Sequence, residues 1–126
     1  MRMGILAVAV IAVLVILLMM FTNYLETTVK TIISHINETE KYFAANDYES
    51  SKKSFFRAKE IWHTKEKIYK LQIEHSELDK INELFTKMEA YFKNKGNDEF
   101  LKDAHTLKYF LTNLILKNKV NLETVL

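Results

Sequence analysis

The chain has 126 residues, with eighteen Lys or Arg against sixteen Asp or Glu and a formal net charge of +2 at neutral pH. This near balance argues against nucleic-acid binding, because a domain that grips phosphates is far more basic. Cysteine is absent, which excludes disulfides, thiolate metal sites and thiol catalysis. With no proline and two glycines, the composition favours a helical chain over a β-rich one.

An uncharged apolar run occupies residues 4–21. As a helix it would extend about 27 Å, close to the roughly 30 Å hydrocarbon core of a bilayer. A cleaved signal peptide is the alternative, but its apolar region normally has only about 7–15 residues, followed by a small-residue cleavage site that this sequence lacks. We therefore expect an uncleaved transmembrane signal anchor. Arg2 and the terminal amine predict cytoplasmic residues 1–3, with residues 22–126 outside the cytoplasm.

Beyond residue 21 the apolar pattern changes from continuous to striped, with steps of three, four and seven that are typical of one helix face. The stripe consists of Leu25, Val29, Ile32, Ile36 and Phe43. Because no helix breaker interrupts this stretch, we expect the membrane helix to continue as a first bundle helix over 22–45. Asn46 and Asp47 end that helix, and either could cap the next one.

A second helix is predicted over 48–72, with aromatic residues at every seventh position. They are Tyr48, Phe55, Trp62 and Tyr69, with Ser51 and Ala58 at intermediate positions. A row of aromatic rings could line a ligand site. A seven-residue repeat, however, keeps side chains on one helix face and favours packing against a partner helix. We therefore expect this aromatic ladder to be buried.

The boundary between the second and third helices is less clear, because neither Gly nor Pro occurs between residues 48 and 94. One very long helix is conceivable, and a weaker apolar stripe runs through the junction. The stripe Leu78, Ile81, Phe85, Met88 and Phe92, however, is out of phase with the aromatic ladder. Ser76 and Asp79 also resemble a capping box. We predict a turn at 73–76, with His75, Ser76 and Asp79 as turn and cap residues.

The third helix is predicted over 77–94, followed by a loop at 95–97 that contains Gly96. A fourth helix over 98–117, capped by Asp98, should bury Leu101, Ala104, Leu107, Leu111 and Leu114 or Ile115. Asn118 and Lys119 should break it, leaving a terminal turn that docks its apolar residues.

The predicted fold class is therefore all-α. A transmembrane helix continues into an antiparallel four-helix bundle made of two helical hairpins, whose helix lengths allow them to cover one another. The expected core includes Ile36, Phe55, Trp62, Phe85 and Leu111.

Complete catalytic or cofactor sites are not apparent. Glu60 and His63 form the E-x-x-H pair of di-iron bundles, but such a site needs a second pair on another helix. His75, Glu77 and Asp79 could hold a cation, although capping and turn hydrogen bonds explain them more simply. We assign no catalytic, cofactor or metal residues.

Basic residues are concentrated over 52–70, a stretch that contains seven Lys or Arg and only two Glu. Lys52, Lys59 and Lys70 should lie away from the aromatic ladder and be exposed. Such a face could contact anionic lipid or an acidic partner. A merely solvated helix face is the alternative.

Three short stretches of the sequence are considered together. They are Lys59-Glu60-Ile61-Trp62 with Lys65 and Lys67, the segment at 73–81, and the C-terminal Asn-Leu-Glu-Thr-Val-Leu. These stretches resemble the bacterial domain-of-unknown-function 4363 family. The N-terminal membrane segment and the chain length also fit this family, so the resemblance extends over nearly the whole chain. The resemblance implies a Gram-positive, spore-former-type source and an extracytoplasmic helical domain. It implies no catalytic residue and no substrate.

The expected function is that of a non-enzymatic accessory protein at the cell envelope, which contacts the lipid bilayer and another membrane or envelope protein. The alternative is a ligand-sensing helical bundle that signals through a membrane partner. A pocket between helices with convergent polar groups would favour the sensor. An exposed Trp62 would make the aromatic ladder a binding surface.

Overall fold

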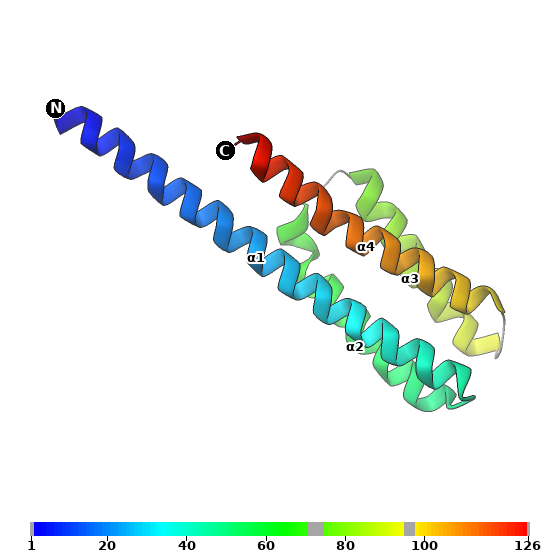
Figure 1. Cartoon of the computed structure of the whole chain (residues 1–126). Helices are drawn as coiled ribbons and strands as arrows, with labels where there is room; N and C mark the ends of the chain where they lie inside the picture. Colours follow the sequence, from blue (N-terminus) through cyan, green and yellow to red (C-terminus); the bar gives the residue numbers. More distant parts are fainter. Residues whose placement is uncertain (1, 71–74, 95–97, 126) are drawn as a thin grey trace.

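The computed structural model describes residues 2–70, 75–94 and 98–125, all of them helical except the short turn after the first helix and Lys70. Four helices follow one another: α1 (Arg2–Ala44), α2 (Tyr48–Tyr69), α3 (His75–Asn94) and α4 (Asp98–Val125). Figure 1 shows α1 extending well beyond the other three helices, which lie along its C-terminal half. The predicted all-α fold with a four-helix bundle is confirmed.

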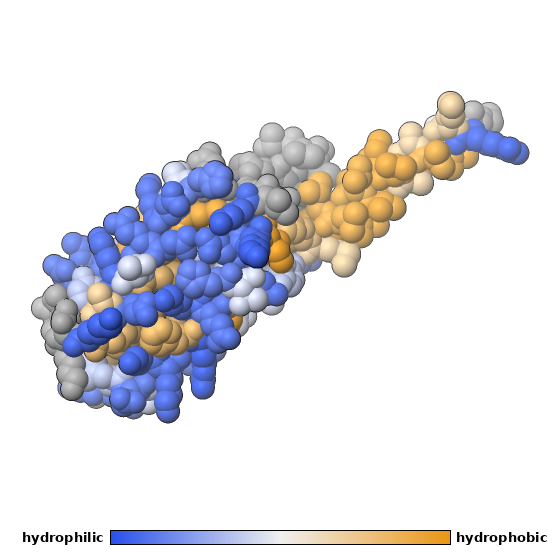
Figure 2. Space-filling view, turned by 180° about the vertical axis from the view of Figure 1, so that it is seen from behind, coloured by the Kyte–Doolittle hydropathy of each residue, from blue (hydrophilic) through white to orange (hydrophobic). Residues whose placement is uncertain are grey.

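Helix α1 has two regions of different character. Its N-terminal apolar side chains are exposed, and within the described residues α1 is the one helix long and apolar enough to cross a membrane. Figure 2 shows this apolar helix projecting from a largely hydrophilic body. From Leu25 onward the predicted stripe is buried in the bundle. The predicted continuation of the apolar segment into the bundle as one helix is therefore confirmed.

The turn between α1 and α2 uses Asn46 and Asp47 together. Asn46 adopts a φ of 60°, a left-handed conformation that asparagine tolerates better than most residues. The amides of Asp47 and Asn46 donate to the carbonyls of Tyr42 at 2.9 Å and Phe43 at 3.1 Å, which is a Schellman ending. Asp47 then caps α2, its carboxylate accepting from the amide of Ser50 at 3.2 Å.

The core lies between all four helices. The five predicted core residues, Ile36, Phe55, Trp62, Phe85 and Leu111, are all buried. Trp62 is 0 % exposed and stacks near Tyr69 and Phe85, with ring centroids 5.3 Å and 6.4 Å away. The aromatic ladder therefore packs against the core: Phe55, Trp62 and Tyr69 are buried, and Tyr48 at its start is half-buried.

The boundary between α2 and α3 agrees with two separate helices. Helix α2 ends at Tyr69 and α3 begins at His75, whereas residues 73 and 74 of the predicted turn lie outside the described residues. Ser76 is already the second residue of α3, so the helix starts earlier than a cap at Ser76 would place it. His75, Ser76 and Asp79 are exposed near that start.

Two predictions for α4 are wrong. Leu101 is 37 % exposed, and its neighbour Phe100 is buried, stacked on Phe43 with ring centroids 4.1 Å apart. Four-residue spacing from Ala104 selects Phe100, since Leu101 lies about 100° further round the helix. The helix also continues to Val125 instead of breaking at 118–119. Asparagine and lysine cost a helix only a fraction of a kcal/mol, so they do not end it.

The remaining loop and terminal predictions cannot be compared residue by residue. The loop at 95–97 lies outside the described residues, and so does the docking of apolar side chains after residue 117. The cap proposed for α4, Asp98, is the first residue of that helix.

Candidate interaction surface

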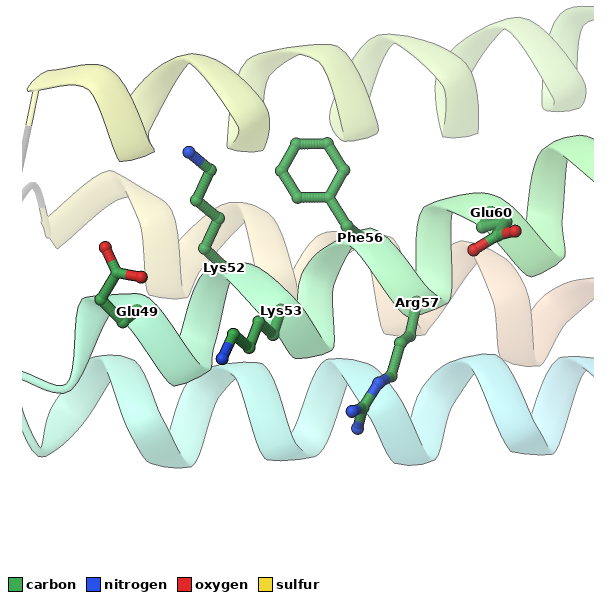
Figure 3. A pocket seen from close by; sticks show the side chains of 6 residues that line it. All are labelled: Glu49, Lys52, Lys53, Phe56, Arg57 and Glu60. Atoms are coloured by element: carbon green, nitrogen blue, oxygen red, sulfur yellow. The ribbon is translucent and has the colours of Figure 1, made fainter.

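A shallow hollow of about 390 Å³ lies on the outer face of α2. Its lining residues are Glu49, Lys52, Lys53, Phe56, Arg57 and Glu60. Figure 3 shows Lys52 and Phe56 directed toward α3, and Lys53 and Arg57 on the opposite flank toward α1. We call these six residues the basic hollow.

The position of the basic hollow follows from the aromatic ladder. Since Phe55, Ala58 and Trp62 fix the inner face of α2, residues at 49, 53, 56–57 and 60 must face outward. Phe56 is half-buried at the centre, and its ring centroid lies 5.5 Å from that of the core residue Phe55. The hollow thus presents an apolar floor continuous with the core.

Three cations surround this floor. Lys52, Lys53 and Arg57 are exposed, and no acidic side chain of the described residues lies within ion-pair distance of any of them. Glu49 and Glu60 mark the two ends. An arginine fork among lysines suits a carboxylate or a phosphate, and the ring of Phe56 suits an apolar side chain beside it.

The three predicted contact residues do not form one surface. Lys52 lies in the basic hollow, but Lys59 is only 24 % exposed and pairs with Glu89 of α3, so its predicted exposure is wrong. Its ammonium also lies 5.7 Å from the ring centroid of Phe56. Lys70 follows the end of α2, about 27 Å from Lys52 along the helix.

A polar chain crosses from α2 to α3 beside the core. The indole Nε1 of Trp62 donates to Oδ1 of Asn82 at 2.7 Å, and Nδ2 of Asn82 donates to Glu66 at 2.9 Å. Burial raises the pKa of Glu66, but hydrogen bonds from Asn82 and His63 and the charge of Lys70 outweigh it, leaving this pKa below its ordinary value. These groups satisfy one another, so the chain is structural.

Two tyrosines are held as neutral phenols. Burial raises the pKa of Tyr69, at the end of the aromatic ladder, to about 12. The hydrogen bond that Tyr91 donates to Glu99 at 2.9 Å raises the pKa of Tyr91 to about 12. Neither phenol is suited to act as a base near neutral pH.

The candidate metal residues are not brought together. His63 contacts Glu66 at 3.2 Å and not Glu60, and Glu77 pairs with Lys117 of α4. Across the described ranges, no group of three or more His, Cys, Asp or Glu side chains could hold a metal ion. His75 and Asp79 lie exposed on α3.

Sequence reasoning did not single out Phe56, and it did not predict that Lys53 and Arg57 lie on the same flank of the hollow. The signal was present, because the outward face of α2 is the complement of the aromatic ladder. The partner of Lys59 could not be found this way, since Glu89 is thirty residues further along the chain.

Comparison with known proteins adds one match. No curated protein and no solved structure is significantly similar to this chain. The model of a family described as "Domain of unknown function (DUF4363)" matches residues 19–125, which covers the whole bundle and the end of the apolar segment. The resemblance noted in the sequence is therefore confirmed, and the chain belongs to the DUF4363 family.

Proposed function

We propose that this protein is a non-enzymatic, membrane-anchored accessory protein that binds a partner at the cell envelope through the basic hollow of α2. The observation that carries the proposal is the arrangement of the hollow. Three exposed cations without acidic partners among the described residues flank a half-buried phenylalanine. The partner chemistry that fits is an acidic peptide segment with an apolar side chain next to its carboxylates.

The apolar segment of α1 supports the membrane anchor. Its side chains are exposed along the projecting part of the helix, and water would disfavour so much uncovered apolar surface. A bilayer would cover it, with every backbone group of the helix bonded internally. Arg2 on the short flank favours a cytoplasmic N-terminus and an extracytoplasmic bundle.

Ligand sensing is the less favoured function. Three of the four rings of the aromatic ladder that could have lined a ligand site, Phe55, Trp62 and Tyr69, are buried in the core. The basic hollow lies on the outer face of α2 and is open to solvent, whereas small-molecule sites are usually enclosed clefts between secondary-structure elements. The features of the described residues thus favour contact with another macromolecule.

Site-specific photo-crosslinking in native membranes tests the proposal. A crosslinking amino acid at Glu49 or Lys53 should capture a reproducible neighbour, whereas the same group at Tyr109, 64 % exposed on α4, should not. The Lys52→Glu/Lys53→Glu/Arg57→Glu variant should lose the crosslink from Glu49 while keeping its helix content. An identical neighbour from Tyr109, or capture that survives the charge reversal, would reject the basic hollow as the binding site.

A further inference from the structure

The lysines of α2 lie at different distances from the apolar segment, measured along the axis of α1. Near the start of α2, the hydroxyl of Ser51 donates to the carbonyl of Thr39 at 2.8 Å. Near its end, the ammonium of Lys65 lies 5.2 Å from the ring centroid of Tyr24. Tyr24 is three residues beyond the apolar segment, a rise of about 4.5 Å. Lys65 is therefore level with the end of the apolar segment, and Lys52, thirteen residues earlier in α2, lies about 20 Å further from that segment.

The other helix ends reach the same level. Lys108 of α4 bonds to Asn37 at 3.0 Å and also pairs with Glu40, which fixes the antiparallel register of α1 and α4. With the same rise per residue, Val125 then lies level with about residue 21 of α1. Glu77 in the first turn of α3 pairs with Lys117, which brings the start of α3 to this end too. The bundle thus ends where the apolar surface of α1 begins.

Basic and aromatic side chains gather at this end. Lys67 and Lys70 are exposed, and Lys65 is half-exposed against Tyr24, itself 40 % exposed. Tyrosine is a residue typical of the membrane–water interface. Lys65 and Lys67 have no carboxylate within ion-pair distance among the described residues, and Lys70 has only Glu66, at 4.0 Å.

Three described acidic side chains at this end are engaged by neighbours, whereas a fourth, Asp79 near the start of α3, is exposed. Glu26 pairs with Lys30 at 3.0 Å, Glu77 pairs with Lys117, and Glu66 accepts from Asn82 and contacts His63. Among the described side chains at this end, Lys65 and Lys67 have no ion-pair partner, and Lys70 shares the carboxylate of Glu66 with His63. We call Lys65, Lys67 and Lys70 the proximal lysines.

We propose that the proximal lysines bind the anionic headgroups of the same bilayer that holds α1, and so hold the bundle directly on the lipid surface. This inference rests on the proposed membrane anchor. Lysine ammonium groups at headgroup level attract anionic lipid, and the attraction decays within about 10 Å at ordinary ionic strength. Lys52, Lys53 and Arg57 lie beyond that range, so they remain available for a partner. The basic residues of α2 thus serve two different surfaces.

The height of the bundle can be measured directly, because the chain contains no cysteine and an introduced one is labelled uniquely. A nitroxide is attached at His75→Cys or at Glu49→Cys, both exposed, in the full-length chain in nanodiscs that contain a nickel-chelating lipid. Spin relaxation should be strongly enhanced at position 75 and nearly unchanged at position 49. Equal enhancement at both positions would overturn the proposed placement.

The lipid contact itself is tested by a matched pair of charge reversals. The proximal variant is Lys65→Glu/Lys67→Glu/Lys70→Glu, and the distal control, Lys52→Glu/Lys53→Glu/Arg57→Glu, changes the charge equally. Wild type and the distal control should unfold at a higher temperature in nanodiscs with phosphatidylglycerol than in those with phosphatidylcholine alone. The proximal variant should lose this difference, and high salt should remove it from wild type and the distal control.

Two failures can be told apart. If the chain is extracted from membranes by carbonate and does not enter nanodiscs, the anchor itself is rejected. If it inserts but the lipid-dependent shift is the same for the proximal variant and the distal control, only the headgroup contact is rejected. Because Lys65 contacts Tyr24, Lys65→Arg within an otherwise wild-type chain should keep the shift. Loss of the shift in this conservative variant would also contradict a charge-based contact.

Discussion

Helix α2 packs against α1 and α3 with different kinds of side chain. Toward α1 it presents the small residues Ser51 and Ser54, with Ala58 on the same face by helical spacing, and the two backbones approach closely enough for Ser51 to bond to the carbonyl of Thr39. Toward α3 it presents Phe55 and Trp62, and the connections are ring contacts and side-chain hydrogen bonds. The α1–α2 interface therefore depends on the close approach of the two backbones. The α2–α3 interface depends on large side chains that fill a wider gap between the helices.

This difference gives opposite sensitivities to volume. The α1–α2 interface should tolerate truncation but not enlargement, whereas the α2–α3 interface should tolerate neither loss of rings nor loss of their polar partners. Four variants test the comparison. For each, thermal or denaturant unfolding in detergent is monitored by the circular dichroism signal of the helices.

The largest expected effect is at Trp62. Trp62→Ala removes a fully buried ring that contacts Tyr69 and Phe85, and should lower the free energy of unfolding by about 3–5 kcal/mol. Tyr109→Ala, which truncates an exposed ring on α4, is the control and should change little. Equal losses in the two variants would mean that the aromatic ladder does not hold α2 to α3.

Enlargement is tested at Ala58, which is 0 % exposed. Ala58→Leu should force α1 and α2 apart and cost about 1–3 kcal/mol, although leucine is more apolar than alanine. Ala90→Leu places the same change on an exposed position of α3 and should be nearly neutral. A stabilised Ala58→Leu variant would show that the α1–α2 interface has spare volume.

The polar partner of the tryptophan is tested at Asn82. Asn82→Ala leaves the indole donor of Trp62 and one oxygen of Glu66 without their hydrogen bonds, at a cost of about 1–3 kcal/mol. Combining it with Trp62→Phe completes a double-mutant cycle. Additive losses would show that the Trp62–Asn82 bond contributes no coupling, and a sub-additive sum is the expected result.

The smallest effect is a pH dependence at the same place. Since the pKa of Glu66 is held below its ordinary value of 4.5, its carboxylate stabilises the fold above that pH, and the stabilisation is lost as pH falls through the lowered pKa. Glu66→Gln should flatten this acid limb of the stability profile. Glu83→Gln, at an exposed pair with Lys87, should leave the limb unchanged. Identical profiles for both variants would exclude Glu66 as the origin of the acid limb.

Local patterns in the sequence predicted much of the fold. The three-four spacing selected the buried face of α1, and the seven-residue repeat selected that of α2. Because capping chemistry is local, the sequence narrowed the cap of α2 to Asn46 or Asp47, and the structure shows that it is Asp47. The prediction failed where a choice between adjacent residues was needed, as for Phe100 over Leu101, because both fit an apolar stripe. It also failed at the C-terminal end of α4, where weak helix breakers were given too much weight.

The candidate surfaces were less accessible to prediction, because they depend on tertiary register. The run of basic residues over 52–70 looks uniform in the sequence. Its division into the basic hollow and the proximal lysines follows only from the levels of Thr39 and Tyr24 on the neighbouring helix. The pairing of Lys59 with Glu89 likewise depends on how α3 folds back on α2.

The unbroken course of α1 also has a mechanical consequence. In the proposed arrangement, one continuous helix forms both the membrane segment and a wall of the bundle, without a hinge residue between residues 21 and 44. A helix of this kind acts as a lever. The part beyond the membrane is about 35 Å long, so a change of about 20° in the tilt of the membrane segment would swing the far tip sideways by about 12 Å. Local bilayer thickness, by changing that tilt, would then set the sideways position of the basic hollow relative to its anchor point.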